Sequence, residues 1–172
     1  EPQGEEKPAS SGPESDSSLF TDFAVSDMGS IQDDSEADPE KGENPRLTTR
    51  QIGVVYQNPA ESVSHRFSVF DIVAEPLKIH EPGMNKGEVT SRVNRLLNEV
   101  HLSTDESFLA RYPHELNMGA IQRICIARAL ILGPSLVIAD EPTSSLDPSV
   151  QAKVLKLLLE LQTERGLTLL FV

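Results

Sequence analysis

The residues best placed for chemistry are two adjacent acids, Asp140 and Glu141, which follow an apolar run at residues 136–139 and precede Pro142. Four apolar residues ended by a proline predict a short strand buried on both faces, as in parallel sheets. Ligands of open α/β sheets bind beyond the carboxyl ends of the strands. There, one acid can hold Mg²⁺ on a nucleotide while its neighbour orients or deprotonates an attacking water. The alternative is a strand that runs out into a solvated acidic turn.

Elements on both sides of the acids are expected to position them. Residues 52–56 are predicted as a strand that ends before Asn58 and Pro59. A helix over about residues 118–132, stopped by a Gly-Pro pair, leads into the strand that carries the acids.

The segment after the acids predicts one more helix and one more strand. Asp147 is expected as the N-cap and Pro148 as the first helical residue, while Gly166 follows the end of the helix. The apolar stripe of residues 149–161 indicates packing on the sheet rather than a partner-binding helix. Residues 167–172 are predicted as another buried strand, which completes a βαβ unit with parallel strands and a right-handed crossover.

The middle of the chain is predicted to be helical. A helix starts near Ser68 as N-cap, covers Val69 to Ala74 and breaks before Pro76. Residues 81–87 are expected to form a loop. From Glu88 onward, apolar residues at relative spacings of 0, 4, 7, 8 and 11 mark one face of a second helix.

Composition limits the classes of function. The 172 residues carry 27 acids against 15 Lys and Arg, which argues against a nucleic-acid partner. Residues 1–48 are rich in Glu, Asp, Ser, Pro and Gly and are predicted to be an acidic disordered tail or insertion. Within them, the apolar island at residues 19–25 is a docking motif or a transient helix. No apolar run reaches the roughly 18 residues needed to span a bilayer, so no direct membrane insertion is expected.

The order of several motifs resembles that of the ATP-binding-cassette (ABC) ATPases. The motifs are Tyr-Pro-His-Glu-Leu at 112–116, Gln-Arg at 122–123, Ile-Ala-Arg-Ala-Leu at 126–130 and Asp-Glu-Pro-Thr-Ser-Ser-Leu-Asp at 140–147. Residues 74–80, together with 112–116, are similar to the branch that imports oligopeptides, dipeptides and nickel.

The resemblance implies an α/β fold, a P-loop NTPase-like parallel sheet with a helical signature subdomain. It makes residues 49–172 a partial nucleotide-binding domain, with the helical subdomain at about 68–132 and a Walker B and D-loop core at 133–172.

The resemblance also implies roles for single residues, with ATP and Mg²⁺ as the nucleotide and its metal. Asp140 matches the Walker B aspartate that holds Mg²⁺, and Glu141 matches the general base or water-orienting glutamate. Gln57 matches the Q-loop glutamine that contacts both Mg²⁺ and the water. Asp147 matches the D-loop aspartate at the dimer interface, and its role as N-cap is compatible with this.

The signature loop departs from the family pattern Leu-Ser-Gly-Gly-Gln, because Leu116 is followed here by Asn117, Met118, Gly119 and Ala120. In the family this loop binds the nucleotide held by the opposite subunit. Gly119 keeps close backbone approach available, and Asn117 can replace the serine as a polar contact. Met118 adds bulk, so our hypothesis is a half-site that is weakened or specialised to one partner.

The phosphate loop G-x-x-x-x-G-K-[ST] and the switch histidine of the family are missing from the sequence. We therefore expect a domain truncated at both ends. Without the backbone cradle and its lysine, the two acids would repel a polyphosphate. The isolated chain is expected to show no saturable MgATP binding at millimolar nucleotide.

These features predict an ATP-hydrolysing subunit that energises an importer for peptides or nickel. Its expected partners are transmembrane permease subunits and a second ABC subunit, identical or not. The expected location is cytoplasmic, peripheral on the inner face of the cell membrane. Two alternatives remain open: a soluble ABC protein that activates or remodels a partner enzyme, and an inactive truncated remnant.

Other reactive residue types give weaker signals. The four histidines, at positions 65, 80, 101 and 114, have no ligand spacing for zinc, so no structural metal is expected. Cys125 is the only cysteine, which excludes an internal disulfide, and it is predicted to be a buried filler. Arg123 and Arg128 are expected either to assist phosphate electrostatics or to pair with carboxylates.

Overall fold

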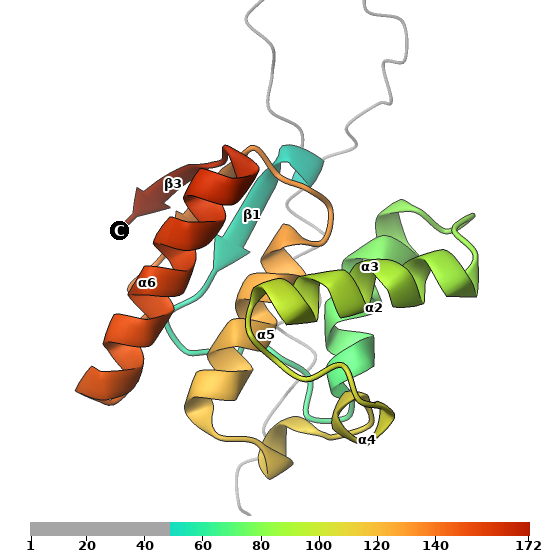
Figure 1. Ribbon diagram of the computed structural model, residues 1–172, viewed down its shortest axis with the longest axis horizontal. Helices are drawn as coiled ribbons and strands as arrows, with labels where there is room; N and C mark the ends of the chain where they lie inside the picture. The colour runs from blue at the N-terminus through green and yellow to red at the C-terminus, as the bar shows by residue number, and fades with distance from the viewer. Residues whose placement is uncertain (1–48) are drawn as a thin grey trace, which may run out of the picture. The chain divides into compact units, whose positions relative to one another are not determined.

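A computed structural model describes residues 49–172, so the predicted tail and its apolar island lie outside the described residues. Three strands form one parallel sheet in the order β1-β2-β3 (Figure 1): β1 (Ile52–Val55), β2 (Leu136–Ala139) and β3 (Thr168–Phe171). The strand that carries the acids is thus the central one. The prediction of a parallel βαβ unit is confirmed, because β2 and β3 pair in parallel across a helix.

The helices account for the remaining regular structure. They are η1 (Thr49–Gln51), α2 (Val69–His80), α3 (Lys86–Glu99), α4 (Glu106–Leu109), η2 (Pro113–Glu115), α5 (Met118–Leu130) and α6 (Pro148–Arg165). Within residues 49–172, none of them is long and apolar enough to cross a membrane.

The sheet is more exposed than the sequence predicts. In β1 and β2 the paired residues Val55 and Ala139 are fully buried, whereas Ile138 on the opposite face is half-buried. Leu170 and Phe171 of β3 are 49% and 45% exposed. The prediction of two strands buried on both faces is therefore wrong for the described residues. The reason is that helices cover one face of this sheet, and β3 lies at its edge.

Helix α2 continues through Pro76, so the predicted break before this proline is wrong. Its start is as predicted, because the Ser68 side chain accepts a hydrogen bond from the backbone N–H of Asp71 at 3.2 Å. A proline inside a helix removes one backbone hydrogen bond and costs about 3 kcal/mol. Here Ile72 and Leu77, on either side of Pro76, are both buried, and this packing offsets the cost.

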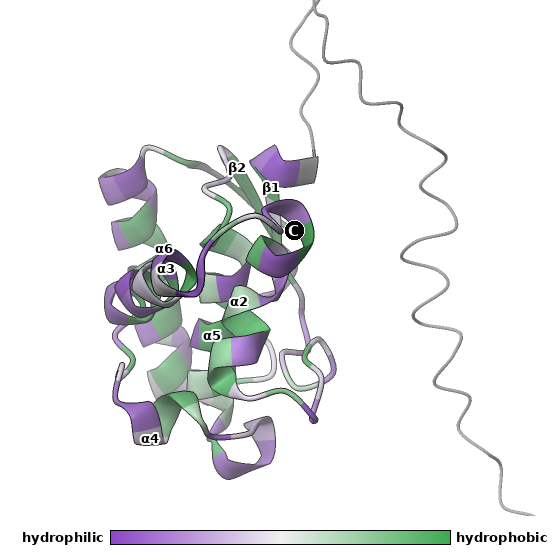
Figure 2. Cartoon of the chain, turned by 90° about the vertical axis from the view of Figure 1, so that its right-hand side faces the viewer, coloured by the Kyte–Doolittle hydropathy of each residue, from purple (hydrophilic) through white to green (hydrophobic). Residues whose placement is uncertain are grey.

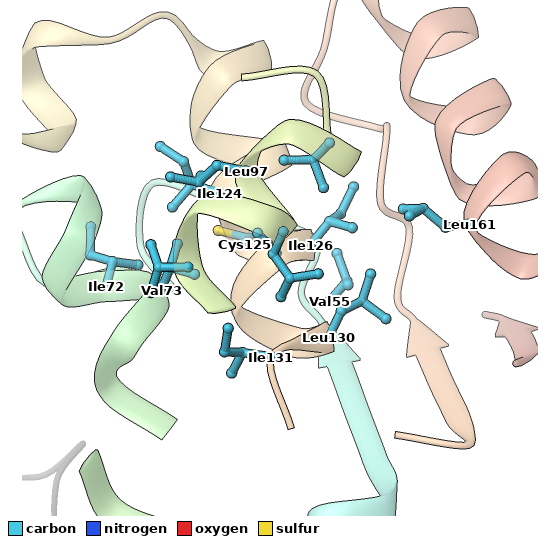
Figure 3. Close-up of a cluster of buried hydrophobic side chains, with 14 of the residues drawn as sticks. Val55, Ile72, Val73, Leu97, Ile124, Cys125, Ile126, Leu130, Ile131 and Leu161 are labelled. Atoms are coloured by element: carbon cyan, nitrogen blue, oxygen red, sulfur yellow. The ribbon is translucent and has the colours of Figure 1, made fainter. Parts of the chain in front are cut away.

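Helix α5 occupies the centre of the core and is buried on two sides. Figure 3 shows Ile124 and Cys125 directed toward Ile72 and Val73 of α2, with Val55 of β1 near another side of the helix. A helix that is apolar around most of its circumference is expected to be largely buried. Although the sequence assigns α5 to the helical subdomain, the helix therefore also supports the sheet. Figure 1 shows it between the strands and α2–α4.

Helix α6 confirms the predicted packing stripe, with Val154, Leu158 and Leu161 buried. Its end is also as predicted, because Gly166 adopts the left-handed conformation (φ 63°) that glycine permits. The apolar stripe of α6 therefore packs within the chain.

Figure 2 shows how hydrophobic and hydrophilic residues are separated in the domain: the strands are hydrophobic, and the outer turns of α3 are hydrophilic.

Candidate functional site

The Gln57 and Glu141 side chains meet at the carboxyl edge of the sheet, although 84 residues separate them. The Gln57 amide Nε2 donates a hydrogen bond of 2.6 Å to Glu141 Oε2. Parallel pairing of β1 with β2 causes this contact, because both residues follow strands that end at the same edge. The contact brings the glutamine that matches the Q-loop beside the glutamate that matches the water-orienting residue.

The backbone fixes both acids to neighbouring strands. The Asp140 N–H donates to the carbonyl of Val55 at 2.9 Å, and the Glu141 N–H donates to the carbonyl of Val172 at 3.1 Å. Glu141 has a backbone φ of 38°, in the left-handed region that residues other than glycine rarely adopt. Such strained residues are found where the surrounding structure holds them for function. The backbone thus leaves the strand direction at Glu141.

The loop after the acids folds back over Gln57. Its first turn is closed by Ser144, whose N–H and hydroxyl both donate to the Glu141 carbonyl at 3.1 Å. The next residue, Ser145, donates its hydroxyl to the Gln57 carbonyl at 3.4 Å. Residues 142–147 therefore contact both partners of the amide–carboxylate pair.

The oxygen atoms at this edge suit a hard divalent cation. Mg²⁺ prefers oxygen ligands and is commonly bound by one or two carboxylates together with substrate phosphates. Among residues 49–172, the exposed Asp140 carboxylate has no hydrogen-bond or ion-pair partner. Because Gln57 uses Nε2 toward Glu141, its Oε1 remains an acceptor. Asp140 and Gln57 thus fit the metal-binding roles predicted for them.

The signature loop forms the first turn of α5. The Asn117 side chain caps the helix, since its Oδ1 accepts a hydrogen bond from the Ala120 N–H at 2.9 Å. Met118 is 37% exposed at this end of the helix. Gly119 is buried, and a Cβ added there would lie 2.8 Å from Cγ1 of Val150 in α6. Close approach at Gly119 therefore serves packing between α5 and α6, which sequence reasoning missed.

Gly119→Ala is expected to lower stability by about 1–2 kcal/mol, because overpacked atoms must shift. The cost stays moderate, since the atom that is met belongs to a side chain. Val150→Ala removes that atom, so Gly119→Ala should cost little further stability when it is added to Val150→Ala. The double variant should therefore be nearly as stable as Val150→Ala alone. Thermal unfolding of the four full-length proteins measures this coupling. Additive losses would contradict the packing explanation.

A hollow of about 820 Å³ lies between the signature loop and the start of α6. It is lined by the predicted nucleotide-contacting residues Asn117, Met118, Gly119 and Asp147, and by cationic side chains including Lys153. Gln57, Asp140 and Glu141 do not line it. The predicted site residues therefore form two groups, joined by the loop 142–147.

Asp147 is at the N-cap position of α6 but does not cap it with its side chain. Its backbone carbonyl accepts hydrogen bonds from the N–H groups of Val150 and Gln151, at 2.8 and 2.9 Å. The prediction is thus right in position and wrong in the capping bond. The negative charge still favours the helix N-terminus electrostatically.

The two arginines of α5 bind backbone carbonyls, which neither prediction for them anticipated. Arg123 Nη1 donates to the His101 carbonyl at 3.3 Å, and Arg128 Nη1 donates to the Ser62 carbonyl at 2.6 Å.

Cys125, predicted to be buried, is 1% exposed, and its Sγ lies 3.3 Å from Ser62 Oγ. Burial raises the pKa of the Cys125 thiol, opposed by the Ser62 hydrogen bond and the charge of Arg128. Helix α5 therefore anchors the segment that follows Gln57.

The four histidines are all exposed. Residues 49–172 contain no group of three or more His, Cys, Asp or Glu that could hold a metal ion.

Comparison with known proteins identifies relatives for most of the chain. A profile described as ABC transporter matches residues 17–144. The oligopeptide transport ATP-binding protein OppF of Escherichia coli is 45% identical over 127 residues, which cover 74% of this chain and 37% of OppF. The chain therefore spans well under half the length of this relative.

Two solved structures share the fold. One is cbiO1 of Clostridium perfringens, described as part of the ABC transporter complex cbiONQ (TM-score 0.61, 29% identity). The match covers 71% of this chain and 46% of that one. The other is the ATP-binding cassette MJ0796, described as a dimer in a post-hydrolysis state with ADP and Pi (TM-score 0.60, 32% identity). That match covers 71% of this chain and 51% of that one.

Proposed function

The chain belongs to the ABC transporter family, and on that premise we propose that it is part of the ATP-hydrolysing subunit of a peptide importer. The single observation that carries the proposal is the 2.6 Å contact between Gln57 and Glu141 beside the exposed Asp140. An amide and two carboxylates therefore lie at one sheet edge, where they can bind a nucleotide phosphate through Mg²⁺ and orient an attacking water.

Each of the three residues has a distinct role in this proposal. Glu141 accepts the proton of the attacking water or orients it, and Gln57 holds the Glu141 carboxylate in place through Nε2. Asp140 and the Gln57 Oε1 are the protein ligands for Mg²⁺ on ATP. When bound, Mg²⁺ neutralises charge that develops on the phosphates.

The second group of residues, around the hollow, is assigned to the partner subunit's nucleotide. Asn117, Met118 and Gly119 form a helix N-terminus, whose N–H groups and dipole favour a phosphate. Asp147 lies across the same hollow, at a loop that a second ABC subunit can contact. The dimer described for the MJ0796 cassette supports this arrangement.

Cargo, membrane partner and location follow from the relatives and are likewise proposals. OppF is named as an oligopeptide transport protein, which favours peptides over nickel and supports transport over remodelling of a partner enzyme. The cbiO1 structure is described as part of a transporter complex, which supports permease subunits as partners. The proposed location is therefore peripheral, on the inner face of the membrane.

The full-length protein, purified with the membrane proteins that accompany it, provides the test. We expect phosphate release from MgATP and ATP-dependent uptake of short peptides into proteoliposomes. ATP turnover without any multi-span partner would favour the enzyme-remodelling alternative. A full-length protein that neither binds nor hydrolyses ATP would contradict the proposal.

The signature half-site gives a second, independent test. Asn117→Ser combined with Met118→Gly is expected to raise the ATPase rate of the assembled complex by about 3- to 10-fold, because it removes the bulk of Met118 and brings back the serine of the family pattern in place of an asparagine whose Oδ1 caps α5. Asn85→Ser is a matched control, because Asn85 caps α3 with the same kind of bond, from Glu88 N–H at 3.0 Å. An unchanged rate in the double variant contradicts the weakened half-site.

A further inference from the structure

We propose that Ser145 is a positioning residue that holds Gln57 in place from its backbone side. The inference rests on the proposed ATPase function, since it concerns how the Gln57 and Glu141 side chains are kept in contact. Ser145 belongs to the loop 142–147 and has no counterpart among the roles predicted from the sequence.

Gln57 is held at two points by one short segment. Its side-chain amide is bound by Glu141, at the start of the segment, and its carbonyl accepts the hydroxyl of Ser145, four residues later. Between these two points, the Glu141 carbonyl receives both the N–H and the hydroxyl of Ser144. The segment therefore closes a loop of hydrogen bonds around the amide–carboxylate pair.

This arrangement defines what Ser145 contributes. Gln57 follows the end of β1 and is exposed, so strand pairing does not fix its backbone. The next anchor along the chain is at the buried Pro59, whose carbonyl accepts hydrogen bonds from the Ser62 hydroxyl at 3.0 Å and from Cys125 Sγ of α5 at 3.7 Å. Ser145 is thus the contact that restrains the Gln57 peptide itself. Without it, the Nε2 atom should visit a wider range of positions relative to Glu141.

The same segment continues into the other group of site residues. Ser145 itself lines the edge of the hollow beside the signature loop, together with Leu146 and Asp147, which immediately follow it. Movement of Asp147, for example on contact with a second subunit, would thus be transmitted to the Gln57 carbonyl through one residue. Ser145 therefore couples contacts made at the hollow to the position of Gln57 relative to Glu141.

Ser145→Ala in the full-length protein is the first test. We expect kcat for ATP to fall about 3- to 5-fold with KM unchanged, as for the loss of one neutral hydrogen bond that acts on the transition state. Ser145→Thr keeps the hydroxyl and should restore kcat. In a Gln57→Ala background, Ser145→Ala should have no further effect, because the group it positions is gone.

Ser135→Ala is the matched control. Ser135 is also an exposed serine whose hydroxyl donates to a backbone carbonyl 84 residues away at 3.4 Å, that of Gln51, but at the opposite end of β1 and β2. A general effect on stability would appear in both variants, whereas an effect on kcat should appear only at Ser145.

The outcomes separate this inference from the proposed function. Wild-type kcat in Ser145→Ala, or an equal loss in the Gln57→Ala background, overturns the role of Ser145 and leaves the ATPase proposal intact. A raised KM with unchanged kcat also overturns it, since this indicates a nucleotide contact rather than positioning. If Glu141→Gln keeps full turnover, the proposed function itself fails.

Discussion

Glu141→Gln is expected to lower ATP turnover of the full-length protein by about 10²- to 10⁴-fold, the usual contribution of general acid–base catalysis. The substitution keeps the size and shape of the side chain, and a glutamine oxygen can still accept the hydrogen bond from Gln57 Nε2. The fold and the loop 142–147 should therefore be unchanged. Removal of one negative charge beside the phosphates should leave ATP bound at least as tightly as in wild type.

Two measurements are needed together, single-turnover phosphate release and nucleotide affinity. Glu160→Gln provides the control for charge, because Glu160 makes an exposed ion pair with Lys156 at 3.6 Å, and such pairs contribute little. It should behave as wild type. Full turnover in Glu141→Gln would remove Glu141 from the centre of the mechanism, and loss of ATP binding would assign it a binding role instead.

Gly53→Ala is expected to give the largest loss of stability, about 3 kcal/mol, at the upper end for overpacked cores. A Cβ at Gly53 would lie 2.6 Å from the backbone oxygen of Ala129 in α5. A backbone atom inside a buried helix cannot move aside as a side chain can. Helix α5 and β1 must therefore separate, and the separation displaces the strand end that leads to Gln57.

Thermal unfolding and ATP turnover of the full-length protein check this prediction. Gly83→Ala is the matched control, because a Cβ at Gly83 meets nothing within 4 Å and its backbone needs no left-handed conformation. It should leave both quantities unchanged. If Gly53→Ala unfolds at the wild-type temperature, the close packing of β1 on α5 is not as described. Gly53→Val should be worse than Gly53→Ala, since it adds two more methyl groups at the same contact.

Sequence patterns identified the local elements reliably. The two strands beside the acids, the Ser68 cap and the Gly166 stop depend on residues within a few positions of each other, and each is confirmed. The order of the motifs also indicated the family before any contact was known. These signals are local, and tertiary packing did not override them.

The structure differs from the sequence predictions at Pro76, in β3 and at Asp147, among other places. Helix α2 runs through Pro76 because its buried face outweighs one lost hydrogen bond. Strand β3 is exposed because the described sheet ends there. The carboxylate of Asp147 makes no cap, although position and residue type both favour one. For α2 and β3 the deciding contacts lie outside the local pattern, whereas nothing in the structure explains the missing cap at Asp147.

The sequence by itself determined which residue types are present for ATP chemistry and in which elements they lie. Only the tertiary structure decided that Glu141 meets Gln57, that Gly119 packs on Val150 and that Ser145 reaches the Gln57 carbonyl. The physical reason is that these contacts join residues 31 to 88 positions apart. Their distances depend on strand register and on how closely α5 approaches β1 and α6, which no local preference encodes.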